Sequence, residues 1–266
     1  MNDNSIQNIT ISGNVVATGD NGNTDNGRVN SVDRTVAINS QGRNVVIQGR
    51  NDQASLDLLS NSLKFTGSSA WNLVFKNLQL ATGNSKGAVD LSSTTGANTV
   101  TFENVKSQGS SLYGGGGNTD VIVKGETSST VSDSYRSANG QTQYVQRNVG
   151  SAGHSVLRRE ANIHDAKSVT VADGASLTLN RSSQGDGINL AGGSTVRVND
   201  GASLTINMNT DNGTESARYH NAGIFMEHGG TVVTGKDSKL TLNTSIGQAI
   251  SLGMGRPADG LTHLCL

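Results

Sequence analysis

The chain has 266 residues and carries 20 Lys and Arg against 21 Asp and Glu, so its formal net charge is −1. This balance excludes a general attraction of the whole molecule to nucleic acid or to an anionic membrane. With 34 glycines, 1 proline and 3% aromatic residues, the composition also excludes a helical bundle and a disordered tail. It is typical of short strands joined by Gly and Asn turns.

The two ends of the chain add further exclusions. The start MNDNSIQNIT is polar and lacks the apolar segment typical of a signal peptide, so we expect any signal and anchor to lie outside this segment, and no apolar run approaches the length of a membrane-spanning helix. The single cysteine, Cys265, excludes an intrachain disulfide and a cysteine-rich metal site. Residues 256–266 break the pattern before them and are predicted to be a tail that follows a single domain over residues 1–255.

The first half of the chain repeats itself. The segment NLVFKNL at 72–78 returns as TVTFENV at 99–105. Phe75 and Phe102 occupy equivalent positions, 27 residues apart, and so do Asn77 and Asn104. Stacking of such repeats would place identical side chains over one another, and we expect Asn77 and Asn104 to form an internal amide ladder.

The second half repeats more strongly, with the same interval. SVTVADGASLTLN at 168–180 returns as TVRVNDGASLTIN at 195–207 and, with a surplus of nine residues, as TVVTGKDSKLTLN at 231–243. Three further short segments follow these repeats, namely GINL at 187–190, GIFM at 223–226 and AISL at 249–252.

Each repeated segment alternates apolar and polar residues, which predicts a strand with one buried face. Three such strands per 27 residues, with turns too short for a helix, predict an all-β solenoid. In this fold each strand pairs in parallel with its counterpart one coil later. A β-sandwich is the rival fold, but it does not explain why the sequence itself repeats.

Two segments interrupt the repeat and are predicted to be loop insertions, at 126–165 and at 210–220. Insertions at a coil corner leave the core intact, so function is sought there. Between Asp133 and Glu160 the first insertion contains no acid. Its candidate ligand-binding residues are Tyr135, Arg136, Tyr144, Arg147, His154, Arg158 and Arg159, and those of the second are Arg218, Tyr219 and His220.

Arginine offers a planar fork to a carboxylate or sulfate, and a neighbouring tyrosine can stack on a sugar ring. The combination predicts a site for an acidic polysaccharide or a mucin-type glycan. An alternative is that these residues only cover the edge of the solenoid. Protonation of His154 or His220 below about pH 6.5 would add positive charge and strengthen the binding of a polyanion in acid.

Catalysis is an alternative function, because some parallel β-helices degrade polysaccharides. A lyase needs clustered carboxylates to hold Ca²⁺ and a base to take a proton, whereas Asp165, Asp173, Asp186 and Asp200 are dispersed. The tripeptide Asn-Thr-Asp occurs at 23–25, 118–120 and 209–211, but no Asp-Asp, Gly-His-Gly or Arg-Ile-Lys accompanies it. We therefore expect no enzyme activity, no cofactor and no metal.

The run RTVAINSQGRNVVIQGRNDQASLDLLSNSLKFTGSSAWNLVFKNLQLAT at 34–82, with the DGASLTLN coils, resembles the pectate-lyase-like adhesive domains of Gram-positive surface proteins. Within that class it is similar to the binding regions of serine-rich repeat adhesins of lactobacilli. The resemblance implies a right-handed parallel β-helix displayed beyond a cell-wall-anchored stalk. It implies adhesion to host epithelial glycans or plant pectin.

These observations predict a monomeric, non-catalytic adhesin domain on the bacterial surface. It would bind pectin-like polysaccharide or host mucin glycans, without specific nucleic acid and without membrane insertion. Two alternatives stay open, a pectate-lyase-like enzyme and a structural solenoid of an autotransporter or biofilm protein.

Overall fold

The computed structural model describes residues 3–17, 23–25, 28–30, 34–38, 41–145, 161–182, 185–209, 221–226, 228–245 and 247–252. All the secondary structure in these residues is β-strand, apart from turns and bends. No helix in this part of the chain is long and apolar enough to cross a membrane.

Most strands belong to two sheets whose neighbouring strands all run parallel. The larger sheet has 14 strands. They are β1 (Asn8–Ile11), β2 (Asn14–Val16), β6 (Asn44–Gly49), β7 (Ser55–Asp57), β9 (Asn72–Thr82), β11 (Asn98–Gly109), β13 (Thr119–Lys124), β14 (Glu126–Val131), β18 (Ser168–Val171), β19 (Ser176–Arg181), β21 (Thr195–Val198), β22 (Ser203–Met208), β24 (Thr231–Thr234) and β25 (Lys239–Thr244).

The second sheet has 8 strands. They are β5 (Arg34–Ile38), β8 (Asn61–Gly67), β10 (Val89–Thr94), β12 (Tyr113–Gly114), β17 (Ala161–His164), β20 (Asp186–Leu190), β23 (Ala222–Met226) and β26 (Gln248–Ser251). Two antiparallel hairpins lie outside both sheets. They are β3 (Asn23–Asp25) with β4 (Arg28–Asn30), and β15 (Ser134–Arg136) with β16 (Thr142–Tyr144).

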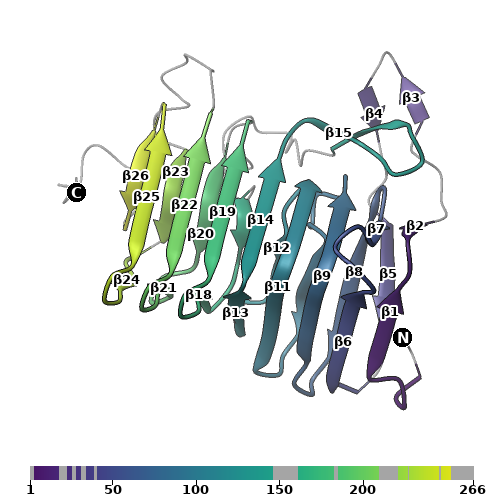
Figure 1. Cartoon of the computed structure of the whole chain (residues 1–266), viewed down its shortest axis with the longest axis horizontal. Coiled ribbons are helices and arrows are strands. Elements are labelled where there is room, and N and C mark those ends of the chain that lie inside the picture. The colour runs from purple at the N-terminus through teal and green to yellow at the C-terminus, as the bar shows by residue number, and fades with distance from the viewer. Residues whose placement is uncertain are drawn as a thin grey trace.

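The strands are stacked as coils of a solenoid, from the N-terminal coil in purple to the last coil in yellow (Figure 1). Leu177 pairs with Leu204, and Leu204 pairs with Leu240, although the second interval is longer by nine residues. The 27-residue repeat therefore corresponds to one coil, and the extra residues lie between strands, where they do not disturb the register. The predicted parallel β-solenoid is confirmed.

Identical residues also stack in the core, as the repeat predicts. The rings of Phe75 and Phe102 are fully buried, 5.5 Å apart and nearly parallel. Trp71 is also buried in this core, with its ring edge-on to Phe65 at 5.1 Å and the Arg43 guanidinium over its face. Because each coil packs on the next, every coil buries its apolar side chains against its neighbours, and the core is continuous along the solenoid.

The asparagine pair forms the expected ladder but not in the interior. Asn104 Nδ2 donates to Asn77 Oδ1 at 3.0 Å, and Asn104 itself is exposed. Both residues have a left-handed backbone, with φ of 49° and 54°, because the long strands β9 and β11 turn a corner here. Asparagine tolerates this conformation better than most residues do, so the ladder marks a surface corner.

The first interruption of the repeat is shorter than the segment 126–165. Strand β14 pairs with β11 and β19, and β17 pairs with β12 and β20. Both strands are parts of the coils, so Glu126–Val131 and Ala161–His164 belong to the solenoid and not to an insertion.

Candidate functional site

A groove of about 630 Å³ lies on the outer face of the larger sheet, near its N-terminal end. Its floor is formed by the ends of β7, β9, β11 and β14, and its wall by the segment that contains β15. The residues that line it are Asn14, Gln53, Ser55, Asp57, Gln79, Leu80, Ala81, Lys106, Ser107, Gln108, Ser128, Thr130, Ser132, Ser134, Tyr135, Arg136 and Ala138.

The wall is a hairpin that leaves the solenoid directly after β14 and crosses the same end of the sheet as β7 and β9 (Figure 1). Ser134 pairs with Tyr144, and Arg136 pairs with Thr142. The carbonyl of Arg136 accepts a hydrogen bond of 3.4 Å from Gln108 Nε2 on the floor. The predicted first insertion thus supplies one side of the groove.

Asp57 attaches this hairpin to the solenoid. Its carboxylate, which is 1% exposed, accepts hydrogen bonds from the Tyr135 hydroxyl at 2.8 Å, from the Ala138 amide at 2.9 Å and from the Ser137 hydroxyl. The amide of Leu59 donates a further bond of 3.0 Å. These four donors satisfy the buried charge, as a carboxylate away from water requires.

Tyr135 therefore does not have the sugar-stacking role that the sequence suggested. Its side chain is 6% exposed, and its ring packs against Gly109, where a Cβ would lie 2.7 Å from a ring carbon. Burial, followed by the negative charge of Asp57, raises the pKa of the Tyr135 hydroxyl well above its usual value. The phenol stays neutral and serves as a donor that fixes the groove wall.

Two cations give the groove its charge. Lys106 and Arg136 are both exposed at its surface, and neither has an ion-pair partner among the described residues. Asp57 is the only acid among the lining residues, and its oxygens are directed to the hairpin. The accessible surface is therefore basic and is otherwise made of amides and hydroxyls.

Of the other predicted residues, Tyr144 is 38% exposed on β16 and does not line the groove. A stacking role for it stays a prediction. Seven predicted residues lie outside the described part of the chain, namely Arg147, His154, Arg158, Arg159, Arg218, Tyr219 and His220.

Several groove residues were missed by sequence reasoning. Gln79 pairs with Lys106, and Lys106 pairs with Ser128, so these three side chains form one row across β9, β11 and β14. The sequence feature that could have identified them is that they are polar residues at alternate positions of the repeated strands. That signal shows outward orientation, but it does not show where a loop will cover the sheet.

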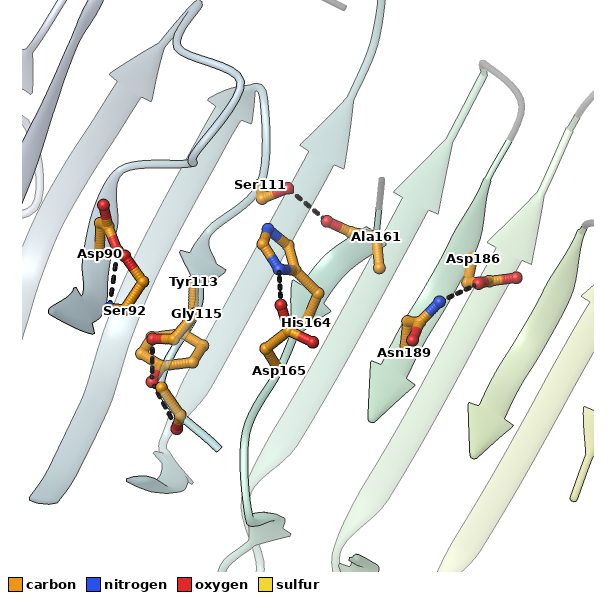
Figure 2. Close-up of polar contacts among 11 residues, drawn as sticks. Asp90, Ser92, Ser111, Tyr113, Gly115, Ala161, His164, Asp165, Asp186 and Asn189 are labelled. Atoms are coloured by element: carbon orange, nitrogen blue, oxygen red, sulfur yellow. Dashed lines mark hydrogen bonds and ion pairs between the residues drawn. The ribbon is translucent and has the colours of Figure 1, made fainter. Parts of the chain in front are cut away.

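A second group of polar side chains lies on the 8-stranded sheet (Figure 2). Asp90 accepts a bond of 2.8 Å from the Ser92 amide, and the Tyr113 hydroxyl donates to the carbonyl of Gly115 at 2.8 Å. Burial raises the pKa of Tyr113 above its usual value. Both contacts join residues two apart and stabilise local turns.

Further along this sheet, His164 Nδ1 lies 3.3 Å from the carboxylate of Asp165, and Asn189 Nδ2 donates to Asp186 at 2.6 Å (Figure 2). Asp186 also accepts the amide of Ala222 at 2.8 Å, which ties two coils together. Among the described residues, no group of three or more His, Cys, Asp or Glu side chains is placed to hold a metal ion.

The comparison with known protein families concerns the first part of the chain. Residues 1–113 match the pectate lyase-like adhesive domain family. This match confirms the resemblance found in the sequence. It covers the N-terminal coils and the floor strands β7, β9 and β11 of the groove.

Solved structures extend the likeness to almost the whole chain. The serine-rich repeat protein (SRRP) of Lactobacillus reuteri 100-23 superposes with a TM-score of 0.68 at 16% identity, covering 93% of this chain and 68% of that protein. The SRRP of L. reuteri 53608 has a TM-score of 0.54 at 17% identity, covering 94% and 93%. At these identities the likeness shows a shared fold. No curated protein sequence matches the chain.

Proposed function

We propose that this pectate-lyase-like adhesive domain binds an acidic polysaccharide in the groove, without catalysis. The observation that carries the proposal is the charge of the groove. Lys106 and Arg136 are accessible, while the carboxylate of Asp57 is occupied by its four hydrogen bonds. A guanidinium pairs with a uronate or sulfate through two bonds, and an ammonium adds a point charge.

The uncharged lining supports a sugar ligand. Gln79, Gln108 and Thr130 place amide and hydroxyl groups beside the two cations, and such groups can both donate to and accept from sugar hydroxyls. A groove that is open to solvent on the face of a rigid sheet suits a chain that lies across it. A small molecule that must be enclosed fits it less well.

The family and the fold support a role outside the cell. The matched family is adhesive, and the neighbouring structures are SRRPs. On this proposal the parent protein is anchored in a bacterial cell wall and presents the domain to a host epithelial surface. Host mucin glycans that carry sialate or sulfate have the same anionic chemistry as pectin, and the binding experiment separates the two sources.

Catalysis is the less favoured alternative. A lyase of acidic polysaccharide needs carboxylates that hold Ca²⁺ beside the scissile uronate. Asp57 is the only acid among the residues lining the groove, and both of its oxygens accept bonds from the hairpin or from Leu59.

Replacement of Lys106 or Arg136 by Ala tests the proposal. We expect each variant to lower the affinity for polygalacturonate roughly tenfold, because a hydrogen bond to a charged group contributes about 1.5 kcal/mol. Calorimetric titration at low and high salt checks this result, and the difference should shrink as salt screens the charges. Lys236→Ala, an exposed cation on a distant turn, is the matched control.

Two of three outcomes would contradict the proposal, and the other identifies the source of the ligand. Unchanged affinity of both groove variants for polygalacturonate would show that the ligand does not bind in the groove. Preference for sialylated or sulfated mucin glycans on a glycan array would move the ligand class from plant to host. Formation of an unsaturated product that absorbs in the ultraviolet, with polygalacturonate and Ca²⁺, would identify an enzyme.

A further inference from the structure

Two straight rows of hydroxyl and amide side chains leave the groove and cross the rest of the larger sheet. The first row consists of Ser128, Thr178, Thr205 and Thr241, and the second consists of Thr130, Asn180, Asn207 and Asn243. Each member is paired in register with the next, on β14, β19, β22 and β25. All of them are half-buried or exposed, so they are accessible from outside the solenoid.

The amides of the second row are oriented by one another. Asn243 Nδ2 donates to Asn207 Oδ1 at 2.8 Å, Asn207 Nδ2 donates to Asn180 Oδ1 at 2.8 Å, and Asn180 Nδ2 lies 3.5 Å from Thr130 Oγ1. A side-chain amide has two N–H donors, and the ladder uses one of them. The ladder therefore holds each amide in a fixed direction and leaves a second donor for a ligand.

Both rows are continuous with the groove. Ser128 and Thr130 line the groove and also begin the rows, and their partners on the preceding strand are Lys106 and Gln108. Parallel strands lie about 4.8 Å apart, so the path from Lys106 to Thr241, four strands further on, is about 19 Å long. The spacing between neighbouring strands is close to the length of one sugar ring in an extended polysaccharide.

The chemistry of the rows selects the occupant. None of the eight side chains is charged, aromatic or aliphatic, which argues against a lipid, a nucleic acid or an apolar peptide as the ligand. A regular series of fixed donors and acceptors fits a polymer that presents hydroxyl groups at a regular interval. The Coulombic attraction would act in the groove, and hydrogen bonding alone would act along the rows.

We propose that the Ser, Thr and Asn rows on β14, β19, β22 and β25 are an uncharged extension of the binding groove that takes the continuing chain of a linear polysaccharide. This inference rests on the proposed function of the groove. It adds that the domain recognises the interior of a long polymer, so that affinity grows with chain length beyond what the groove holds.

The experiment compares a short ligand, trigalacturonate, with a long one, polygalacturonate, on a double variant, Thr178→Val and Thr205→Val. Valine has the shape of threonine without the hydroxyl and keeps its strand propensity. We expect the double variant to bind polygalacturonate about fivefold to tenfold more weakly, since two neutral hydrogen bonds are lost, and to bind trigalacturonate as the wild type does. Thr170→Val, on β18 of the same sheet but outside the two rows, is the matched control.

The outcomes separate the two proposals. One outcome is that Lys106→Ala lowers the affinity for both ligands while the double variant lowers the affinity for neither. In that case the ligand binds in the groove and not along the rows, which overturns this inference alone. Equal affinity of the wild type for the short and long ligands, per binding site, overturns it in the same way. If the wild type binds neither ligand, the proposed function fails and this inference fails with it. Thermal unfolding of each variant verifies that the fold is kept.

Discussion

Asp57 shows how much of the groove depends on one residue. It lies on the short strand β7, and its partners Tyr135, Ser137 and Ala138 come about 80 positions later in the chain. A buried carboxylate costs free energy unless it is hydrogen-bonded. The hairpin supplies those bonds, and the carboxylate in turn holds the hairpin against the sheet.

The variant Asp57→Asn is expected to release the hairpin without unfolding the solenoid. In the variant, an amide nitrogen, which is a donor, would replace one carboxylate oxygen and face the donors of the hairpin. The loss of charge-assisted hydrogen bonds should destabilise the attachment of the hairpin by about 2 to 3 kcal/mol. Hydrogen exchange measured by mass spectrometry should show faster exchange at 134–144 and unchanged exchange in β19 and β22. Asp52→Asn, an exposed acid on a nearby turn, is the control. Protection of the hairpin at the wild-type level would show that Asp57 does not hold it.

At the scale of the element, the corner between the halves of β9 and β11 needs a left-handed residue. Asn104 adopts φ of 54° there, donates to Asn77 and accepts the amide of Glu126 at 3.0 Å. In the next coil the corner residue is Gly125, with φ of 57°. Its missing side chain leaves room for the Asn104 amide, whose carbon lies 2.9 Å from the position of a Cβ.

Two substitutions separate backbone strain from hydrogen bonding at this corner. Asn104→Ala is expected to lower the free energy of unfolding by about 2 kcal/mol, because it loses the bonds and forces alanine into the left-handed region. Asn104→Gly removes the bonds but tolerates the backbone, so it should cost about 1 kcal/mol. Urea denaturation measures both values. Equal losses would mean that the backbone conformation contributes nothing.

At the scale of the whole molecule, each coil is stabilised by its neighbours. The centre of the stack is buried on both sides, whereas the apolar residues of the last described coil, including Leu240 and Leu242, are only half-buried. A substitution of similar size should therefore cost more in the centre.

Phe102→Ala is expected to lower the free energy of unfolding by about 3 to 5 kcal/mol, because it opens a cavity beside Phe75 in a fully buried layer. Leu240→Ala should cost about half as much or less, since part of that side chain already contacts water. Denaturant melts of both variants check the comparison. A larger loss for Leu240→Ala would show that the last coil, and not the centre, limits stability.

The coil was predictable because each coil of a solenoid places equivalent residues over one another. Equivalent positions need similar side chains, so the sequence repeats with the length of one coil. Leu177, Leu204 and Leu240 are separated in the sequence by intervals of one coil, with or without an insertion, and they pair in the structure. The insertion after β14 was predictable for the same reason, as a departure from the repeat.

The groove was decided only by the tertiary structure. Whether a tyrosine in an inserted loop faces a ligand or the sheet depends on what lies beneath it, and for Tyr135 a buried carboxylate from a distant coil lies there. No periodicity connects Asp57 to the hairpin, because the contact is made once and is not repeated. Periodicity therefore predicts the repeating scaffold, while the folded chain decides where a single loop crosses the sheet and forms the basic groove.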